Sequence, residues 1–138
     1  MTDFNDWNAR VIDEFRANGG KVEAFPNDNL ILLHHTGAKS GQERVSPLAY
    51  QRVDGGYAIF ASKGGAPDNP AWYHNLQANP KATIETGTET IPVTARVAGP
   101  EEREPIWTRQ KQAEPGFAEY ETKTDRQIPV VILEPARS

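Results

Sequence analysis

The chain has 138 residues, and its 15 basic and 19 acidic residues give a formal net charge of −4 at pH 7. This length predicts a single domain, which we expect to span residues 1–138. No basic run is present to neutralise a row of phosphates, which argues against DNA or RNA as a partner. The absence of cysteine excludes disulfides, Cys-ligated zinc and thiol nucleophiles.

The first 20 residues predict an amphipathic helix. Phe4, Trp7, Val11 and Phe15 are spaced three, four and four residues apart, which places them on one helical face, and a glycine pair at 19–20 ends the pattern. We expect this face to pack on the sheet that follows; contact with a membrane surface or with a second subunit are the alternatives. The acidic start has no apolar signal region, and no window holds roughly 20 apolar residues, which predicts a cytoplasmic protein.

Residues 22–133 predict a barrel of short strands, because apolar and β-branched segments alternate with turn signals such as Asp54-Gly55-Gly56. Further helices are predicted at 70–78, 100–113 and 117–122, the first with Asn69 as its N-cap and Pro70 as its first residue. Pro47 is expected at a strand edge or bulge, because proline donates no backbone hydrogen bond. These elements indicate an α+β fold: a small, partly open barrel of six or seven mostly antiparallel strands, an N-terminal helix and two or three short helices.

A polar loop follows the apolar run at 30–33. It reads T-G-A-K-S-G-Q-E-R-V-S-P over residues 36–47. Its glycines let the backbone turn and approach a ligand closely, while its hydroxyls and cations attract an anion. The alternative is a mobile, solvated hairpin tip of ordinary surface composition. The residues that would form the anion site are Gly37, Lys39, Ser40, Gly41, Arg44 and Ser46.

A second loop repeats this composition. Residues 61–70 read A-S-K-G-G-A-P-D-N-P, again after an apolar strand, and lead into the N-terminus of the helix at 70–78, which itself attracts anions. Two such loops in one small chain favour a binding site over two unrelated surface turns. Trp72, Tyr73, Phe117 and Tyr120 are suited to stack on a planar ring, and plain core positions are the alternative for Trp72 and Phe117.

Other chemistry is not indicated. His34 and His35 are adjacent on a predicted strand and point to opposite faces, so we expect one buried and one exposed histidine and no metal site. Neither a G-x-S-x-G elbow nor a complete P-loop pattern occurs. The sequence thus argues against covalent hydrolysis and against a metal-dependent enzyme.

Three segments resemble a known family. They read H-T-G-A-K-S-G-Q-E-R-V-S-P-L, A-S-K-G-G-A-P-D-N-P-A-W-Y-H-N-L-Q-A-N-P and Y-E-x-K-T-x-R-x-I-P-V-V-I-L, and they resemble the deazaflavin-dependent nitroreductases of actinobacteria over about residues 30–133. The resemblance implies a split β-barrel of the flavin and deazaflavin oxidoreductase superfamily, with coenzyme F420 as cofactor. It implies that the anionic tail of F420 meets Lys39, Ser40, Gly41 and Arg44, with Gly37, Ser46 and Pro47 beside it. It also implies that the ring lies against Ala61, Ser62, Lys63, Gly64, Gly65, Asn69, Pro70, Ala71 and Trp72.

The resemblance implies a reaction as well. F420 passes a hydride in one two-electron step, so the protein needs to supply position, dipoles and a proton donor. We expect a quinone, an enone or a nitroaromatic as acceptor, in a pocket walled by Phe117 and Tyr120. Tyr120 or Ser62 would donate a hydrogen bond as negative charge develops. Two alternatives stay open: the barrel binds flavin mononucleotide (FMN) instead, or the chain carries F420 without turnover. The sequence leaves both a monomer and a homodimer open.

Overall fold

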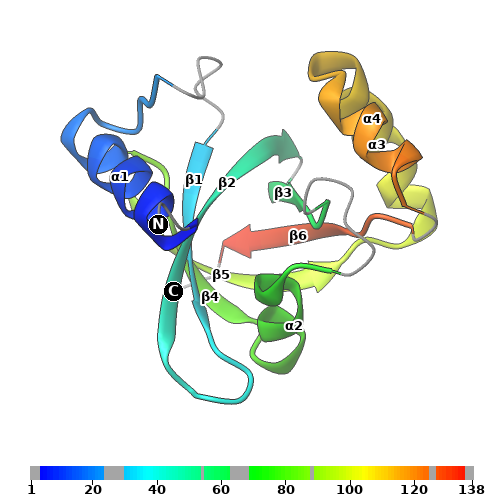
Figure 1. Cartoon of the computed structure of the whole chain (residues 1–138). Coiled ribbons are helices and arrows are strands. Elements are labelled where there is room, and N and C mark those ends of the chain that lie inside the picture. Colours follow the sequence, from blue (N-terminus) through cyan, green and yellow to red (C-terminus); the bar gives the residue numbers. More distant parts are fainter. Residues whose placement is uncertain are drawn as a thin grey trace.

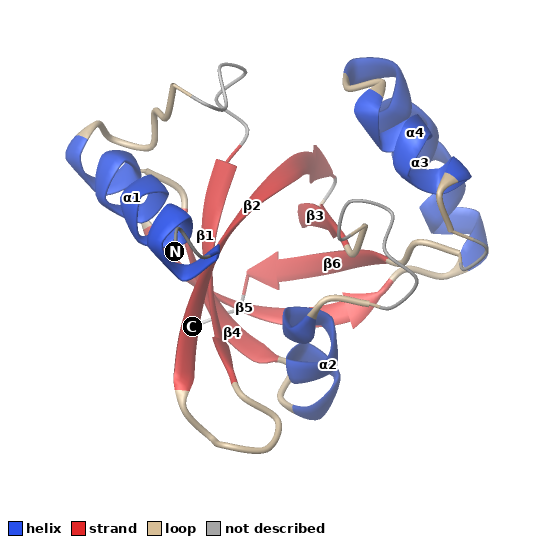
Figure 2. Cartoon of the chain, viewed as in Figure 1, coloured by secondary structure: helices blue, strands red, loops and turns tan. Residues whose placement is uncertain are grey.

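The computed structural model describes residues 4–23, 30–53, 55–62, 69–87, 89–124 and 127–135, with the side chains of the first helix from residue 9 onwards. Within these residues the chain forms six strands and four helices (Figure 1 and Figure 2). The strands are β1 (Leu30–Thr36), β2 (Glu43–Val53), β3 (Gly56–Phe60), β4 (Lys81–Glu85), β5 (Thr90–Val97) and β6 (Val130–Pro135). The helices are α1 (Phe4–Ala17), α2 (Ala71–Ala78), α3 (Pro100–Ala113) and α4 (Gly116–Thr122).

The strands form a closed antiparallel barrel in the order β1-β2-β3-β6-β5-β4. The pairing of β1 with β4, which places Leu33 opposite Ile84, closes the sheet, so the barrel is less open than the sequence indicated. The predicted α+β fold with six antiparallel strands and four helices is confirmed. Closure protects the strand edges from pairing with another chain.

The barrel interior holds one hydrophobic cluster, because alternate residues of each strand point inward. Trp72 and Leu76 of α2 belong to the same cluster. Since the wall is closed, α2 must reach the interior through one end of the barrel, and Figure 1 shows this helix in green. The strand residues of the cluster that are at most 2% exposed are Ile31, Leu33, Ile59, Ile84, Val93, Val131 and Leu133.

The outer face of β1 and β2 is covered by α1 (Figure 1). Val11 and Phe15 pack on Leu32 of β1, so the predicted packing of the N-terminal helix on the sheet is confirmed. Arg16 at the end of α1 donates to both carboxylate oxygens of Glu85 in β4, at 3.1 and 2.6 Å, which ties the helix to the barrel. None of the described helices is long and apolar enough to span a membrane.

The outer face of β3 and β6 is covered by α3, with α4 beside it (Figure 1). Trp107 of α3, 1% exposed, packs with Phe60 of β3 and Ile132 of β6. Its indole N–H donates to a carboxylate oxygen of Glu121 in α4 at 2.6 Å. A partly buried hydrogen bond therefore joins the two helices, and α4 depends on α3 for its place.

Two local expectations have different outcomes. Pro47 of β2 lies opposite Leu32 of β1. On its other side, β2 pairs with β3 only over residues 50–53. Among the described strands, β2 therefore has a neighbour on one side only at Pro47, which is the edge position predicted. The prediction that Asn69 caps α2 is wrong by one residue, because Pro70 is the N-cap and the helix begins at Ala71. The φ of Pro70, −67°, suits either side of a helix boundary, and its extended ψ of 157° places it outside the helix.

Candidate functional site

The hairpin loop between β1 and β2 has the tight backbone that its glycines predicted. The N–H of Gly37 donates to the carbonyl of Gln42 at 2.9 Å, and Gly41 adopts a φ of +71° that favours glycine. A Cβ on Gly37 would lie 2.5 Å from the Ser40 hydroxyl oxygen and 3.6 Å from Arg44 Nε. A side chain at position 37 would displace the Ser40 hydroxyl, so glycine leaves room for this hydroxyl to lie close to the loop backbone. Exposed turn backbone of this kind can form an anion-binding concavity.

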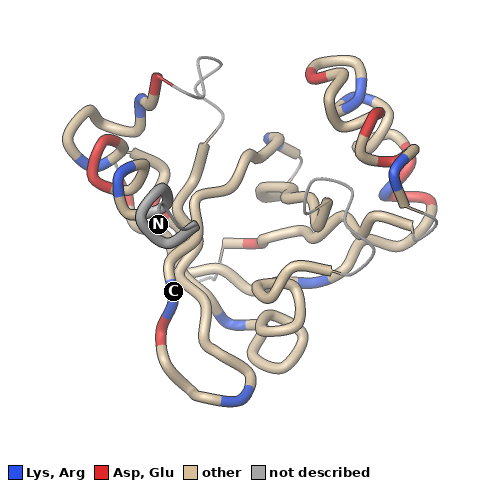
Figure 3. Tube along the Cα trace, in the orientation of Figure 1, with Lys and Arg blue, Asp and Glu red and all other residues tan. Residues whose placement is uncertain are grey.

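Two cations lie on this hairpin. Lys39 and Arg44 are both exposed, and neither forms an ion pair with a carboxylate in the described part of the chain. Figure 3 shows basic positions along the hairpin, which extends away from the barrel. An exposed cation without a protein partner is free to meet a ligand. Their placement therefore fits the tail of F420, whose phosphate and carboxylates are anionic.

The hairpin loop contacts α2, the helix that follows the second predicted loop. The N–H of Ala38 donates to Asn75 Oδ1 at 2.9 Å, and Asn75 is 7% exposed. The two loops that the sequence singled out are thereby joined through one helix. This contact was not predicted.

A chain of buried polar contacts continues from Asn75 into the barrel. Asn75 Nδ2 lies 3.0 Å from His35 Nδ1, and His35 Nε2 lies 2.9 Å from the hydroxyl oxygen of Ser46 on β2. Burial, followed by the electrostatic effects of Arg44 and His34, together lower the pKa of His35 to about 4. His35 is therefore neutral at pH 7. Ser46, a predicted cofactor residue, is the half-buried end of this chain of contacts.

The second loop is described at its two ends only. Ala61 and Ser62 are buried beside the barrel interior, and the N–H of Ala61 donates to the carbonyl of Pro129 at 3.0 Å. After the loop, Pro70 is buried, Asn69 is half-buried and Ala71 is exposed. Trp72 is 6% exposed and belongs to the interior cluster. Three predicted cofactor residues, Lys63, Gly64 and Gly65, lie outside the described residues.

The predicted substrate wall lies on α4. Phe117 and Tyr120 share one face of the helix, with ring centroids 5.3 Å apart, as their spacing predicted. Phe117 also contacts Phe60, at 5.6 Å between centroids, two residues before Ser62. The wall residues thus lie near the start of the second loop and pack against the cluster under α3. Their role as a substrate wall stays a prediction.

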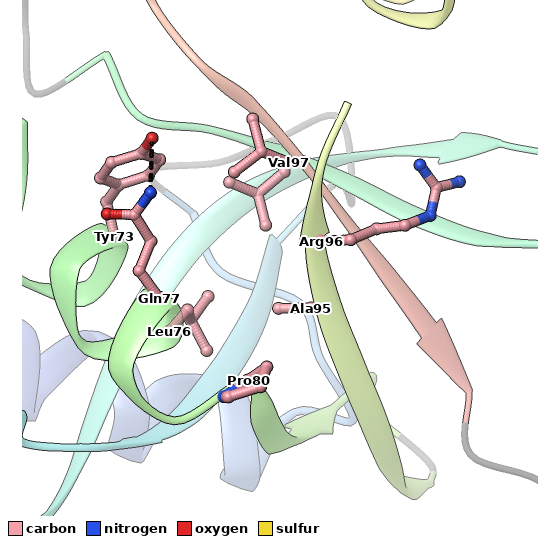
Figure 4. A pocket seen from close by; sticks show the side chains of 8 residues that line it. Tyr73, Leu76, Gln77, Pro80, Ala95, Arg96 and Val97 are labelled. Carbon is pink, nitrogen blue, oxygen red and sulfur yellow. Dashed lines mark hydrogen bonds between the residues drawn. The ribbon is translucent and has the colours of Figure 1, made fainter. Parts of the chain in front are cut away.

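A cavity of about 250 Å³ lies between α2 and β5 (Figure 4). Gln77 donates to the Tyr73 hydroxyl oxygen at 3.1 Å at one side of the cavity, where Figure 4 draws the bond as a dashed line. Ligand pockets usually measure about 300–1,000 Å³, so this space is too small for the whole coenzyme with its tail. Its remaining lining residues are Leu76, Pro80, Ala95, Arg96, Val97 and Val131.

The two adjacent histidines face opposite sides of β1, as predicted. His35 is buried at the interior side, whereas His34 lies on the outer side and pairs with Glu85, which also binds Arg16. Among the described residues, no three His, Asp or Glu side chains lie together in a way that could hold a metal ion.

Sequence reasoning missed Asn75 and the role of His35. Alternation along β1 already places His35 on the same side as Leu33, and a signal for Asn75 was its position on the core side of a short helix next to Leu76. The partnership itself needed the fold, because Asn75 and His35 are 40 residues apart.

Comparisons with known proteins identify the family of the chain. An F420H(2)-dependent quinone reductase of Mycobacterium tuberculosis is 42% identical over 106 residues, which are 75% of this chain and 71% of that protein. A solved F420-H2 dependent reductase, FDR-A, is 48% identical with a TM-score of 0.70, over 77% of this chain and 94% of that chain. Another solved structure, described as a domain-swapped dimer, is 40% identical with a TM-score of 0.72, over 96% of this chain and 100% of that chain. A model of the F420H(2)-dependent quinone reductase family matches residues 7–135, and the chain belongs to this family.

Proposed function

We propose that the chain holds coenzyme F420 at the β1–β2 hairpin and α2 while it reduces a quinone. Membership of the family makes the chain an oxidoreductase that takes reduced F420 as hydride donor and a quinone as acceptor. The observation that supports this location is the contact between Ala38 and Asn75, which joins a cationic, glycine-bearing loop to the helix behind the second loop. The glycines, hydroxyls and cations present there fit an anionic tail.

Each part of the site has a proposed task. Lys39 and Arg44 neutralise the tail, and the hydroxyls of Ser40 and Ser46 donate to it, with Gly37, Gly41 and Pro47 shaping the loop. When bound, F420 supplies a two-electron hydride transfer, and the protein therefore needs no covalent nucleophile or metal. The residues that we place against the ring are Ala61, Ser62, Lys63, Gly64, Gly65, Asn69, Pro70, Ala71 and Trp72.

We place the acceptor near Phe117 and Tyr120. A quinone gains negative charge on oxygen as the hydride arrives, and a hydroxyl donor beside that oxygen lowers the barrier. Tyr120 is the first candidate because its ring lies at the margin of the aromatic cluster, and Ser62 is the second. Enones and nitroaromatics accept a hydride in the same way and belong to the acceptor classes to be screened.

The oligomeric state and the location of the protein are proposals as well. We infer a homodimer, supported by the relative that is described as a domain-swapped dimer, with a monomer as the alternative that light scattering would reveal. The cytoplasmic location and a membrane contact through α1 stay predictions. The membrane contact has little support, because Val11 and Phe15 of the apolar helix face are buried against the barrel.

A titration of F420 into three variants tests the location of the coenzyme. Lys39→Ala and Arg44→Ala should each raise the dissociation constant about tenfold or more, because a charge-assisted contact contributes roughly 1.5–3 kcal/mol. Arg52→Ala is the matched control, an exposed arginine on the same strand eight residues from Arg44, roughly 26 Å away. The Lys39 and Arg44 variants should keep the wild-type melting temperature. If the Lys39 and Arg44 variants bound F420 as tightly as the wild type does, the coenzyme tail would not bind at this loop.

Two further observations on the wild-type protein separate the alternative functions. A non-catalytic carrier would bind F420 but would not oxidise the reduced coenzyme when menadione, a soluble quinone, is added. An FMN protein would purify with bound yellow flavin and would bind F420 weakly.

A further inference from the structure

We propose that His35 and Asn75 are positioning residues that turn the hydroxyl of Ser46 outward as a hydrogen-bond donor to the coenzyme. The inference rests on the proposed location of the coenzyme and adds two residues that make no contact with it. It follows from the direction of each hydrogen bond in the chain from Ala38 to Ser46.

The direction is fixed at the backbone of the hairpin loop. The N–H of Ala38 can only donate, so the atom of Asn75 that lies 2.9 Å from it must be the carbonyl oxygen. The amide nitrogen of Asn75 is then the atom that lies 3.0 Å from His35 Nδ1. An amide nitrogen only donates, so Nδ1 of the neutral imidazole must accept.

The proton of the neutral imidazole therefore sits on Nε2. A neutral histidine carries one ring proton, and with Nδ1 as acceptor that proton points from Nε2 to the Ser46 oxygen 2.9 Å away. The Ser46 oxygen accepts this bond, so the serine must direct its own proton elsewhere. Ser46 is half-buried, and Arg44, two residues before it on the strand, is exposed. The serine hydroxyl is thus a ready donor next to a cation.

The direction of the bond between His35 and Ser46 matters for binding an anion. If the serine donated to the imidazole, the buried histidine would still have its hydrogen bonds, but the serine would offer only oxygen lone pairs, which an anion repels. The contact between Asn75 and Ala38 selects the opposite direction. The loop that carries Lys39 thereby also sets the polarity of the Ser46 hydroxyl on the neighbouring strand.

The test is a thermodynamic cycle on F420 affinity. Ser46→Ala should weaken F420 binding about tenfold, as loss of a hydrogen bond to a charged group does. His35→Leu should weaken it severalfold, because the hydroxyl is then free to rotate. His35→Gln should restore affinity to within about twofold, since its amide nitrogen can donate to Ser46 while its oxygen accepts from Asn75. His34→Leu, on the opposite face of the same strand, is the matched control and should bind as wild type does.

The decisive comparison is the double variant. If His35 acts through Ser46, His35→Leu has no further effect on the dissociation constant in the Ser46→Ala background. If the increases in the dissociation constant caused by the two substitutions multiplied in the double variant, His35 would support only the fold and the proposal would be overturned. Wild-type affinity of Ser46→Ala would overturn it too, even where His35→Leu does not fold. If Lys39→Ala and Arg44→Ala weaken binding but the serine and histidine variants do not, the positioning inference fails and the coenzyme location stands.

Discussion

His35 is a single residue that joins the hydrophobic interior to the polar end of the barrel. It is 3% exposed and neutral at pH 7, because burial holds its pKa at about 4. Groups of both signs lie around it: Arg44 from β2 and His34 from its own strand, with Glu43 and Lys81 lining the same shallow cavity. Protonation of His35 therefore costs free energy in the folded protein and not in the unfolded chain.

We predict that this histidine makes the fold sensitive to mild acid. Between pH 6.5 and 4 the unfolded chain binds a proton at His35 that the folded protein does not bind, so stability falls as the pH falls through this window. The free energy of unfolding should drop by about 2 kcal/mol from pH 7 to pH 5 through this residue. His35→Gln removes the proton site, and urea unfolding at both pH values should show a smaller drop in the variant.

The comparison of the two proteins isolates His35. His34 and His74 are present in both, so the two proteins differ only at position 35. Glu85 has its pKa lowered to about 2 by its hydrogen bonds from Arg16 and His34, which outweigh its burial, so its contribution is lost only below its usual pKa of 4.5. An equal loss of stability between pH 7 and pH 5 in wild type and His35→Gln would contradict the account.

At the scale of elements, α2 and α4 show how a short helix can serve a site. α2 has only eight residues, yet it directs Trp72 and Leu76 into the barrel and Asn75 to the hairpin loop. The seven residues of α4 contain none that is buried, and the helix is attached through Glu121 to Trp107 and Lys111 of α3. The place of α4 is therefore set by side-chain contacts with α3 and with the aromatic cluster beneath it.

We predict separate effects for the hydroxyl and the ring of Tyr120. Tyr120→Phe keeps the ring contact with Phe117 and should lower turnover with menadione about tenfold or more at unchanged F420 affinity and melting temperature. Tyr120→Ala should in addition raise the KM for the quinone, because part of the wall is lost. Steady-state kinetics and melting curves of both variants supply the measurements.

The competing role for Tyr120 is packing alone. In that case Tyr120→Ala lowers the melting temperature while the kinetics of the folded protein stay at wild-type values, and Tyr120→Phe has no effect. That outcome would end the substrate-wall hypothesis and leave Ser62 as the remaining candidate donor.

Local signals explain which elements the sequence could predict. Strand alternation, the glycines of the hairpin and the spacing of Phe117 and Tyr120 each depend on a few neighbouring residues, and each was predicted in place. The boundary at Pro70 was misplaced by one residue, because a proline φ fits both an N-cap and a first helical turn. The contacts of Asn75 could not be predicted, since they depend on how α2 sits on the barrel end.

At the scale of the whole molecule, the fold separates stability from function. The interior cluster and the two outer clusters under α1 and α3 bury most of the large apolar side chains that the structure describes. The hairpin that carries Lys39 and Arg44 extends beyond these clusters, so it can change without loss of the core. The chain as a whole carries a net charge of −4, and an anionic coenzyme is therefore attracted by this local pair of cations and not by the overall charge.

The central claim is that this chain oxidises reduced F420 with a quinone by means of the hairpin site. The most direct measurement is the rate at which the absorbance of oxidised F420 returns when menadione is added to F420H2 and protein, for wild type and for the double variant Lys39→Ala/Arg44→Ala. The account predicts rapid, menadione-dependent oxidation by the wild type. It also predicts that the double variant needs at least about tenfold more coenzyme to reach half of its maximal rate. Oxidation at the same rate and the same coenzyme dependence in both proteins would contradict the hairpin site, and no oxidation by the wild type would contradict the reductase itself.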